Sequence, residues 1–295
     1  MNMHPDILAA CTVTGGKTFS TGDFPAELDR LYEDKKDYKH QLEEIQEQLH
    51  DLQSMMYAHN RYGMVVIFQA MDAAGKDSAI GAIMSGVNPH GVRIHAFKRP
   101  TDTELEHDYL WRTQLCLPER GTIAVFNRSY YEEVLVVRVH PGILTGAQRI
   151  PEQYIRTPDL VWQQRYEDIR HLEQYLHRNG IEVVKIYLHM SRDEQRRRFL
   201  DRIAEPDKNW KFNAGDVDER AHWDAYMEAY TDCINATATP ASPWYVVPAD
   251  DKYNARLIAG RLILSRMQQL PISYPVLDAA HLAELEACKA RLLQE

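Results

Sequence analysis

The sequence contains few cysteines, and none of them is paired in a motif. The four cysteines lie far apart and form no C-x-x-C pair: Cys11, Cys116, Cys233 and Cys288. This spacing argues against a disulfide framework and against a structural zinc site of the usual kind. A reducing compartment suits such a chain, so we expect a cytoplasmic protein.

Long apolar runs and an excess of basic charge are also missing. The longest apolar stretches, such as GMVVIF at 63–68, are far shorter than the roughly 20 residues that a membrane-spanning helix needs. The first residues lack a basic region followed by an apolar core, so no secretory signal is expected. The net charge of −9 argues against a general nucleic-acid coat, although it leaves room for a local cationic site for a polyanion. We therefore expect neither a membrane nor a nucleic acid as a partner.

Short apolar runs that alternate with helical patterns are what the chain does contain. Five runs predict buried strands, at 63–69, 92–97, 122–127, 182–189 and 244–248. Helical patterns lie between and after them, at about 76–86, 103–116, 129–138, 152–178, 191–203, 217–235 and 252–269. Such alternation predicts a three-layer α/β fold, in which helices cover both faces of a five-stranded parallel sheet. Ligands of such sheets bind beyond the carboxyl ends of the strands.

The ends of the chain differ from this central part. Residues 1–24 are rich in Gly, Thr and Ser, and predict a loose N-terminal arm. Residues 26–58 contain neither Gly nor Pro and carry a helical apolar stripe, so they predict a long amphipathic helix. This helix either pairs with another subunit or packs on its own domain, and the pattern favours neither. We expect one domain over 25–270, followed by a helical extension over 271–295.

The stretch FQAMDAAGKDSAI, residues 68–80, resembles a phosphate-binding loop. It follows a predicted strand and opens a predicted helix, which is the setting that such a loop requires, although a chance strand–loop–helix turn is the alternative. Backbone N–H groups and the helix N-terminus favour phosphate there, and the Lys76 ammonium adds a point charge. The spelling departs from G-x-x-x-x-G-K-[ST] at Ala70 and at Asp77. The predicted phosphate-binding residues are Ala73, Ala74, Gly75, Lys76, Asp77 and Ser78.

Two carboxylates in this stretch, Asp72 and Asp77, predict a metal ion. A carboxylate at position 77 is a stronger hard-oxygen ligand than the usual hydroxyl group, but it repels phosphate unless a cation lies between them. The alternative is that Asp77 only favours the start of the helix, while Asp72 points to solvent.

The third predicted strand ends in polar residues, in the stretch FNRSYYEEVLVVRVHP at 126–141. Asn127 occupies the position where phosphate-loop enzymes usually carry an acid, and it can orient a metal-bound water. The Arg128 guanidinium can meet the charge that spreads over a transferring phosphoryl group, or it forms an ordinary surface ion pair. Glu132 can return a carboxylate to the site.

A basic segment, SRDEQRRRFLDRIAEPDKNWKF at 191–212, contains seven Lys and Arg residues among acids. Arg198 and Arg202 share one helix face, and Lys208 and Lys211 follow Pro206. The segment predicts a lid, at about 198–217, that brings cations over phosphates and excludes water. A solvated charged helix is the alternative.

Several blocks together resemble the polyphosphate kinase 2 family over about residues 25–270. They are DAAGKDS (72–78), SGVNPHGV (85–92), KRPTDTELEHDYLWR (98–112), NRSYYEEVL (127–135) and the lid at 198–211. The GKDS spelling is similar to that of the class III subgroup, which acts on both AMP and ADP. Ala70 stands where a glycine of the family is expected.

The resemblance implies a phosphate-loop kinase fold with a helical lid. It also implies phosphoryl transfer between inorganic polyphosphate and AMP or ADP, with Mg²⁺, or alternatively Mn²⁺, and a homo-oligomer is expected. The implied catalytic residues are Asp72, Lys76 and Arg128; the metal ligands Asp72, Asp77 and Glu132; the lid contacts Arg202, Lys208 and Lys211; and the nucleotide or phosphate contacts Lys98, Arg99 and Asn127. An ATP-dependent nucleoside or nucleotide kinase and a non-catalytic polyphosphate-binding protein remain alternatives.

Overall fold

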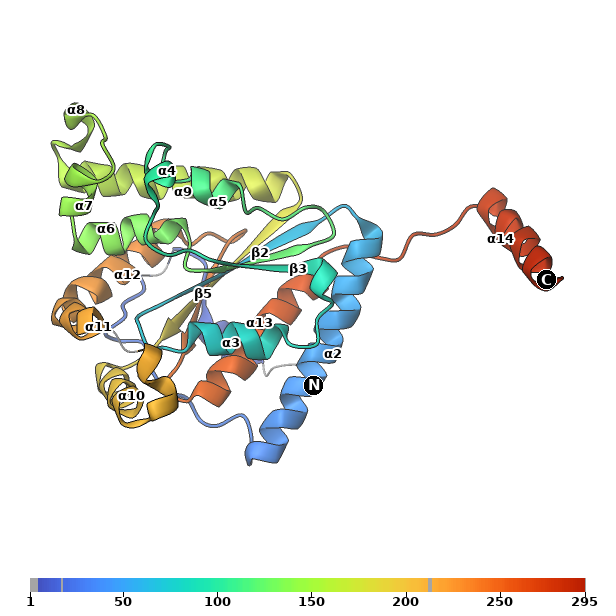
Figure 1. The fold of residues 1–295 in the computed structure, drawn as a ribbon, viewed down its shortest axis with the longest axis horizontal. Coiled ribbons are helices and arrows are strands. Elements are labelled where there is room, and N and C mark those ends of the chain that lie inside the picture. Colours follow the sequence, from blue (N-terminus) through green and yellow to red (C-terminus); the bar gives the residue numbers. More distant parts are fainter. Residues whose placement is uncertain (1–4, 17, 212–213, 295) are drawn as a thin grey trace.

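A computed structural model describes residues 5–16, 18–211 and 214–294, and it contains one twisted sheet between two layers of helices (Figure 1). The strands are β1 (Thr12–Val13), β2 (Gly63–Ala70), β3 (Val92–Ala96), β4 (Ile123–Asn127), β5 (Ile181–His189) and β6 (Trp244–Pro248). They lie in the order β1-β6-β5-β2-β4-β3, and all neighbours are parallel except β1 and β6. The five predicted parallel strands are confirmed. The number was wrong, because the described chain contributes a sixth strand.

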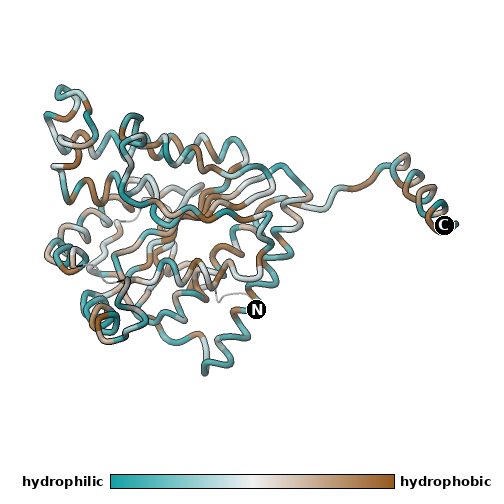
Figure 2. The backbone as a smooth tube through the Cα atoms, in the orientation of Figure 1, coloured by the Kyte–Doolittle hydropathy of each residue, from teal (hydrophilic) through white to brown (hydrophobic). Residues whose placement is uncertain are grey.

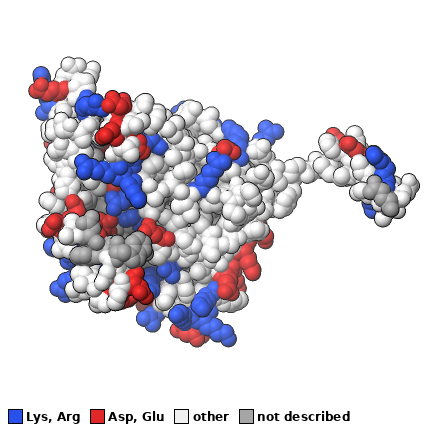
Figure 3. Space-filling view, viewed as in Figure 1, with Lys and Arg blue, Asp and Glu red and all other residues white. Residues whose placement is uncertain are grey.

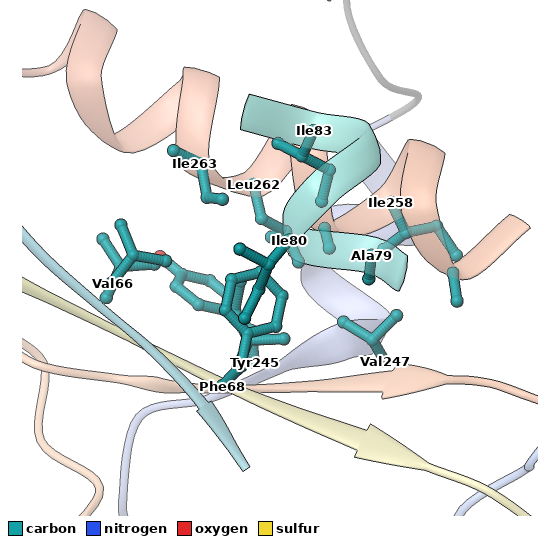
Figure 4. Packing of buried hydrophobic residues seen from close by; sticks show 14 of the residues in the cluster. Val66, Phe68, Ala79, Ile80, Ile83, Tyr245, Val247, Ile258, Leu262 and Ile263 are labelled. Carbon is teal, nitrogen blue, oxygen red and sulfur yellow. The ribbon is translucent and has the colours of Figure 1, made fainter. Parts of the chain in front are cut away.

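Helices cover both faces of this sheet. On one face lie α2 (Lys35–His59), α3 (Lys76–Met84) and α13 (Lys252–Gln268), and on the other α6 (Val136–Val139), α9 (Pro158–Arg178) and α12 (Trp223–Thr237). Successive residues of β2 alternate between two apolar cores, with Val66 and Phe68 in one and Val65 and Ile67 in the other. Figure 4 shows α3 and α13 packed over β2 and β6. Both faces of β2, β4, β5 and β6 are therefore buried, as their apolar runs indicate (Figure 2). The edge strand β3, which was also predicted to be buried, is partly exposed because, among the described residues, it has a neighbouring strand on one side only.

The remaining helices are short, apart from α10 and α14. They are α1 (Pro5–Cys11), α4 (Asp102–Leu105), α5 (Trp111–Gln114), α7 (Gly142–Gly146), α8 (Glu152–Ile155), α10 (Arg192–Ala204), α11 (Ala214–Glu219) and α14 (Ala279–Leu292), with 3-10 turns η1 (Pro89–Gly91), η2 (Tyr130–Val134), η3 (Pro206–Lys211) and η4 (Arg220–His222). Some patterns that predict one helix are interrupted. The 152–178 pattern breaks before Pro158, which lacks an N–H group and begins α9 instead.

The N-terminal arm is not loose where the structure describes it. Thr12 and Val13 pair antiparallel with Tyr245 and Trp244 at the edge of the sheet. Farther along, the Asn235 side chain bonds both the N–H and the carbonyl of Phe19, each at 2.8 Å. These contacts join the arm to residues more than 200 positions away, which explains why local composition did not predict them.

The long N-terminal helix starts later than predicted and packs on its own domain. Asp34 caps it, because its side chain accepts from the N–H groups of Lys36 and Asp37, so residues 26–34 precede the helix. The helix lies against α13 at very short range, since a Cβ on Gly260 would come within 3.0 Å of Ile45. Of the two alternatives, packing on the same domain is therefore the one that the structure has.

The C-terminal helix α14 stands apart from the domain, at the end of an extended segment (Figure 1). Its described residues are all exposed. No helix within the described residues is both long and apolar enough to cross a membrane. The division of the chain at 24 and 270 stays a prediction.

Candidate active site

The phosphate-loop stretch connects the central strand β2 to α3. Its backbone turns at Gly75, with φ of 97°, and at Ala73, with φ of 66°. Glycine adopts this left-handed region without strain, whereas alanine does so at a cost of about 1 kcal/mol. Ala70, by contrast, is the last residue of β2 and has ordinary strand geometry. The missing glycine at position 70 therefore does not disturb the loop. The position where the backbone conformation favours glycine is instead that of Ala73.

Lys76 opens α3, and its side chain is only 8 % exposed. Its Nζ donates to the carbonyl of Ala70 at 2.7 Å and to that of Met71 at 3.4 Å. Burial, followed by the nearby positive charge of Arg128, lowers the pKa of Lys76 to about 8 against the opposing effect of the acids around it. A buried ammonium held mainly by carbonyl groups gains from an anionic partner. Lys76 therefore offers a buried ammonium group that an anion such as phosphate would suit.

Arg128 follows β4 in a left-handed conformation, with φ of 65°. Its guanidinium donates to Asp72 Oδ1 at 2.7 Å and to Glu132 Oε2 at 3.0 Å. The charge of Glu132 is the main reason why the pKa of Arg128 is raised, so the group stays protonated. Gln69, buried at the end of β2, donates to the other Glu132 oxygen at 2.8 Å. Arg128 is therefore held between carboxylates from two strand ends, unlike an isolated surface ion pair.

Asn127 and Asp77 also meet across these two strand ends. Asn127 Nδ2 donates to Asp77 Oδ1 at 2.5 Å. Because the carboxyl ends of parallel strands lie at one edge of the sheet, a residue after β4 can reach the first turn of α3. The contact fixes one oxygen of Asp77, whose side chain is exposed to the cavity.

These side chains surround a cavity of about 670 Å³, which is within the range of small-molecule sites. Most of the predicted site residues line it: Asp72, Ala73, Ala74, Gly75, Lys76, Asp77, Ser78, Lys98, Asn127, Arg128 and Arg202. Among the described residues, Arg99 and Glu132 are not part of the lining. Lys208 and Lys211 lie in η3, and their side chains are outside what the structure describes. Figure 3 shows basic side chains, with acidic ones beside them, on the side of the molecule where α10 and α11 lie in Figure 1.

Some lining residues were not predicted. Lys252 and Arg256 come from α13, and Asp216 comes from α11. Asp216 lies 3.8 Å from Arg202, and burial, followed by the charge of Asp72, raises its pKa. No local motif marks these residues, because they reach the cavity only through packing. Gln69 did carry a signal, since an amide inside an otherwise apolar strand needs a partner.

The acidic residues fit a magnesium ion in part. Asp72 and Asp77 both line the cavity, and carboxylate oxygens are the ligands that Mg²⁺ prefers. Glu132 is different, because Gln69 and Arg128 already engage its two oxygens. Within the described residues, no group of three or more acidic, His or Cys side chains is gathered for a metal. Mg²⁺ sites in kinases commonly use one or two carboxylates and complete the shell with water and substrate phosphates, which suits Asp72 and Asp77.

Comparisons with known proteins identify the family of the chain. The family model described as polyphosphate kinase 2 matches residues 32–273, which include the parallel strands β2 to β6 and the whole cavity lining. The chain belongs to the polyphosphate kinase 2 family. The resemblance carried by the phosphate-loop and strand-end blocks is thereby confirmed.

Individual relatives are similar over most of the chain. An ADP-polyphosphate phosphotransferase of Rhodopseudomonas palustris is 51% identical, over 95% of this chain and 96% of its own. An AMP/ADP-polyphosphate phosphotransferase of Meiothermus ruber is 40% identical, over 80% of this chain and 83% of its own. The crystal structure of polyphosphate kinase 2 from Arthrobacter aurescens superposes with a TM-score of 0.85 at 34% identity, covering 98% of this chain and 97% of that one. The mixed α/β fold of the family is thus confirmed.

Proposed function

We propose that this polyphosphate kinase 2 protein transfers phosphoryl groups reversibly between inorganic polyphosphate and ADP or AMP. The observation that carries the proposal is the meeting of Lys76, Arg128, Asp72 and Asp77 at one cavity. Two cations and two carboxylates suit a metal-bound phosphate chain. Relatives named for ADP alone and for AMP and ADP support both acceptors.

The chemistry needs no covalent intermediate. Lys76 and Arg128 stabilise the charge that spreads over the transferred phosphoryl group, and the loop N–H groups hold the phosphates in line. Asp72 either binds metal or orients the attacking oxygen of the acceptor. Glu132 and Gln69 hold the Arg128 guanidinium in place through the hydrogen bonds described above. Lys98, Arg99 and Asn127 are proposed to contact nucleotide or phosphate.

A donor exchange tests this function against its rivals. The purified protein is incubated with Mg²⁺ and either AMP or ADP, with polyphosphate in one arm and ATP in the other, and the nucleotides are separated by chromatography. We expect polyphosphate to convert AMP to ADP and ADP to ATP. Phosphorylation of AMP by ATP but not by polyphosphate would indicate an ordinary nucleotide kinase. Bound but unconverted polyphosphate would indicate a binding protein.

The proposed metal ligands are Asp72 and Asp77, with Mg²⁺ or alternatively Mn²⁺ as the ion. The metal would neutralise phosphate charge beside these carboxylates. In an Asp77→Asn variant the side-chain size is kept while one ligand charge is lost. We therefore expect the Mg²⁺ concentration for half-maximal activity to rise several-fold and excess Mg²⁺ to restore part of the rate. A titration curve that matches the wild type would reduce Asp77 to a residue that starts α3.

The proposed lid comprises residues 198–217, with Arg202, Lys208 and Lys211 closing over polyphosphate. Replacing Arg202 by Ala removes a cation that lines the cavity and pairs with Asp216. We expect the KM for polyphosphate to rise several-fold, and the KM for ADP to change less, because the lid faces the polyanion. The difference in the KM for polyphosphate between the variant and the wild type should change with salt concentration, since salt screens partly exposed charges. Equal changes in both KM values would contradict the proposed role.

We further propose a homo-oligomer that uses α14. Helices as short as α14 are marginal in water when nothing packs against them, and its Leu282 and Leu285 are about half exposed. A Leu282→Glu/Leu285→Glu variant is expected to have a smaller mass than the wild type by light scattering. Glu284→Ala, on the same helix, is the control. An unchanged mass in the double variant would rule out this interface.

A further inference from the structure

Carbonyl groups on three successive residues of the phosphate loop bond to side chains of α10. Gln195 Nε2 donates to the carbonyl of Asp72 at 2.9 Å. Arg198 Nη1 donates to the carbonyls of Ala73 at 3.2 Å and Ala74 at 2.9 Å. No motif of the loop itself encodes these contacts, because α10 is more than 100 residues away in the sequence.

Arg198 is a structural tie whose donors are all in use. Its Nε donates to Glu194 at 2.6 Å, and its Nη2 donates to the carbonyls of Ala249 at 2.6 Å and Asp250 at 3.0 Å. Together with the two loop contacts, these bonds occupy the five N–H groups that a guanidinium has. The side chain is only 13% exposed. Arg198 therefore joins the loops after β2 and β6 to α10, and no N–H group of it is left to bind a phosphate.

The orientation of the carbonyls determines where the loop N–H groups point. In a trans peptide, the C=O of one residue and the N–H of the next point in opposite directions. Carbonyls drawn toward α10 at Asp72 and Ala74 therefore turn the N–H groups of Ala73 and Gly75 away from α10. Ala73 also has the positive φ that an alanine adopts only when its surroundings hold it there.

We propose that Arg198, assisted by Gln195, is a positioning residue that holds the phosphate loop with the N–H groups of Ala73 and Gly75 turned away from α10 and unengaged by it. This inference rests on the proposed function for its effect on catalysis. It differs from the lid role that the shared helix face of Arg198 and Arg202 predicts, in which both arginines lie over phosphates. Gln195 extends the tie, because its Oε1 accepts from Arg220 at 2.8 Å, beyond the lid.

Three full-length variants test the inference by steady-state kinetics with polyphosphate and ADP. Arg198→Met removes the donors and keeps the length, Arg198→Lys keeps the charge without the fork, and Arg196→Met is a control that is 68% exposed on the same helix. A misplaced loop acts on the transition state, so we expect Arg198→Met to lower kcat by about 10²-fold. Arg198→Lys should recover only a small part of the lost kcat, and Arg196→Met should have the kcat of the wild type.

The alternative, a phosphate-binding role, gives a different result. In that case Arg198→Lys would restore most of the rate, and the loss would lie in the KM for polyphosphate and change with salt. That pattern, or a normal kcat in Arg198→Met, would overturn the proposal. If Arg198→Met does not fold, Gln195→Met, which removes a single loop bond, is expected to lower kcat by about tenfold, and a normal kcat would count against the tie.

Hydrogen exchange provides a readout that does not depend on activity. Without substrate, Arg198→Met should exchange the amides of 71–76 faster than wild type, while those of β5 stay unchanged. Equal exchange in the loop would contradict the tie, and faster exchange throughout would show general loosening and contradict it as well. An inactive wild type would count against the proposed function alone, and the exchange comparison would still decide the inference.

Discussion

Replacing Lys76 by Ala is expected to reduce turnover with polyphosphate and ADP by about 10²-fold or more, since the lost ammonium stabilises transition-state charge. Arg128→Ala should have a loss of similar size. Steady-state kinetics measure the loss of turnover, and thermal unfolding confirms that each variant folds. Lys39→Ala, which removes an exposed lysine of α2, is the matched control and should retain the wild-type rate. Near-normal turnover in Lys76→Ala would rule out the proposed mechanism.

The pKa of Lys76 adds a second test of the same group. In the free protein Lys76 is charged below about pH 8 and loses its charge above it. The kcat/KM for polyphosphate, which reports groups of the free enzyme, should therefore fall as the pH rises through about 8. In Lys76→Arg the guanidinium keeps its proton, so this fall should disappear whatever the remaining rate. A fall at the same pH in Lys76→Arg would assign it to another group.

Removing Glu173 should have the largest effect on stability. Its carboxylate bonds the fully buried Lys185 ammonium at 2.7 Å, the hydroxyl groups of Tyr131 and Tyr130 at 2.6 and 3.0 Å, and that of Ser242 at 3.1 Å. Glu173→Leu leaves the Lys185 charge buried without its partner, a change that typically costs about 3–5 kcal/mol. Burial already lowers the pKa of Lys185 against the attraction of Glu173. Denaturant unfolding at neutral pH measures the loss.

A double variant separates the effect of the unpaired charge on stability from the effect of changed packing. Glu173→Leu/Lys185→Met removes both charges, so it should recover a large part of the lost free energy of unfolding. If the double variant is less stable than Glu173→Leu alone, the unpaired charge is not the cause. Tyr130 and Tyr131, which Glu173 holds, lie two and three residues after Arg128. Loss of Glu173 should therefore also lower the rate of phosphoryl transfer in molecules that remain folded.

The central part of the fold could be predicted from local sequence patterns. Continuous apolar runs indicate strands that are buried on both faces, and the run before DAAGKDS indicates the strand that carries the phosphate loop. Lys76, Asp77, Asn127 and Arg128 could be predicted together because parallel strands bring their carboxyl ends to one edge. Contacts between distant segments were not predictable in this way. Asp216 reaches the cavity from α11, for which no spacing rule exists.

The sequence by itself determined the family, the order of the five parallel strands along the chain, and the chemical groups of the phosphate loop. These follow from periodicity and short motifs, which are properties of neighbouring residues. Only the tertiary structure decided that Glu132 holds Arg128, that Arg198 ties the loop to α10, and that β1 closes the edge of the sheet. Each of these depends on hydrogen bonds whose partners meet through packing. A carboxylate or guanidinium in the sequence shows what it can bind, whereas the surrounding fold decides which partner is within reach.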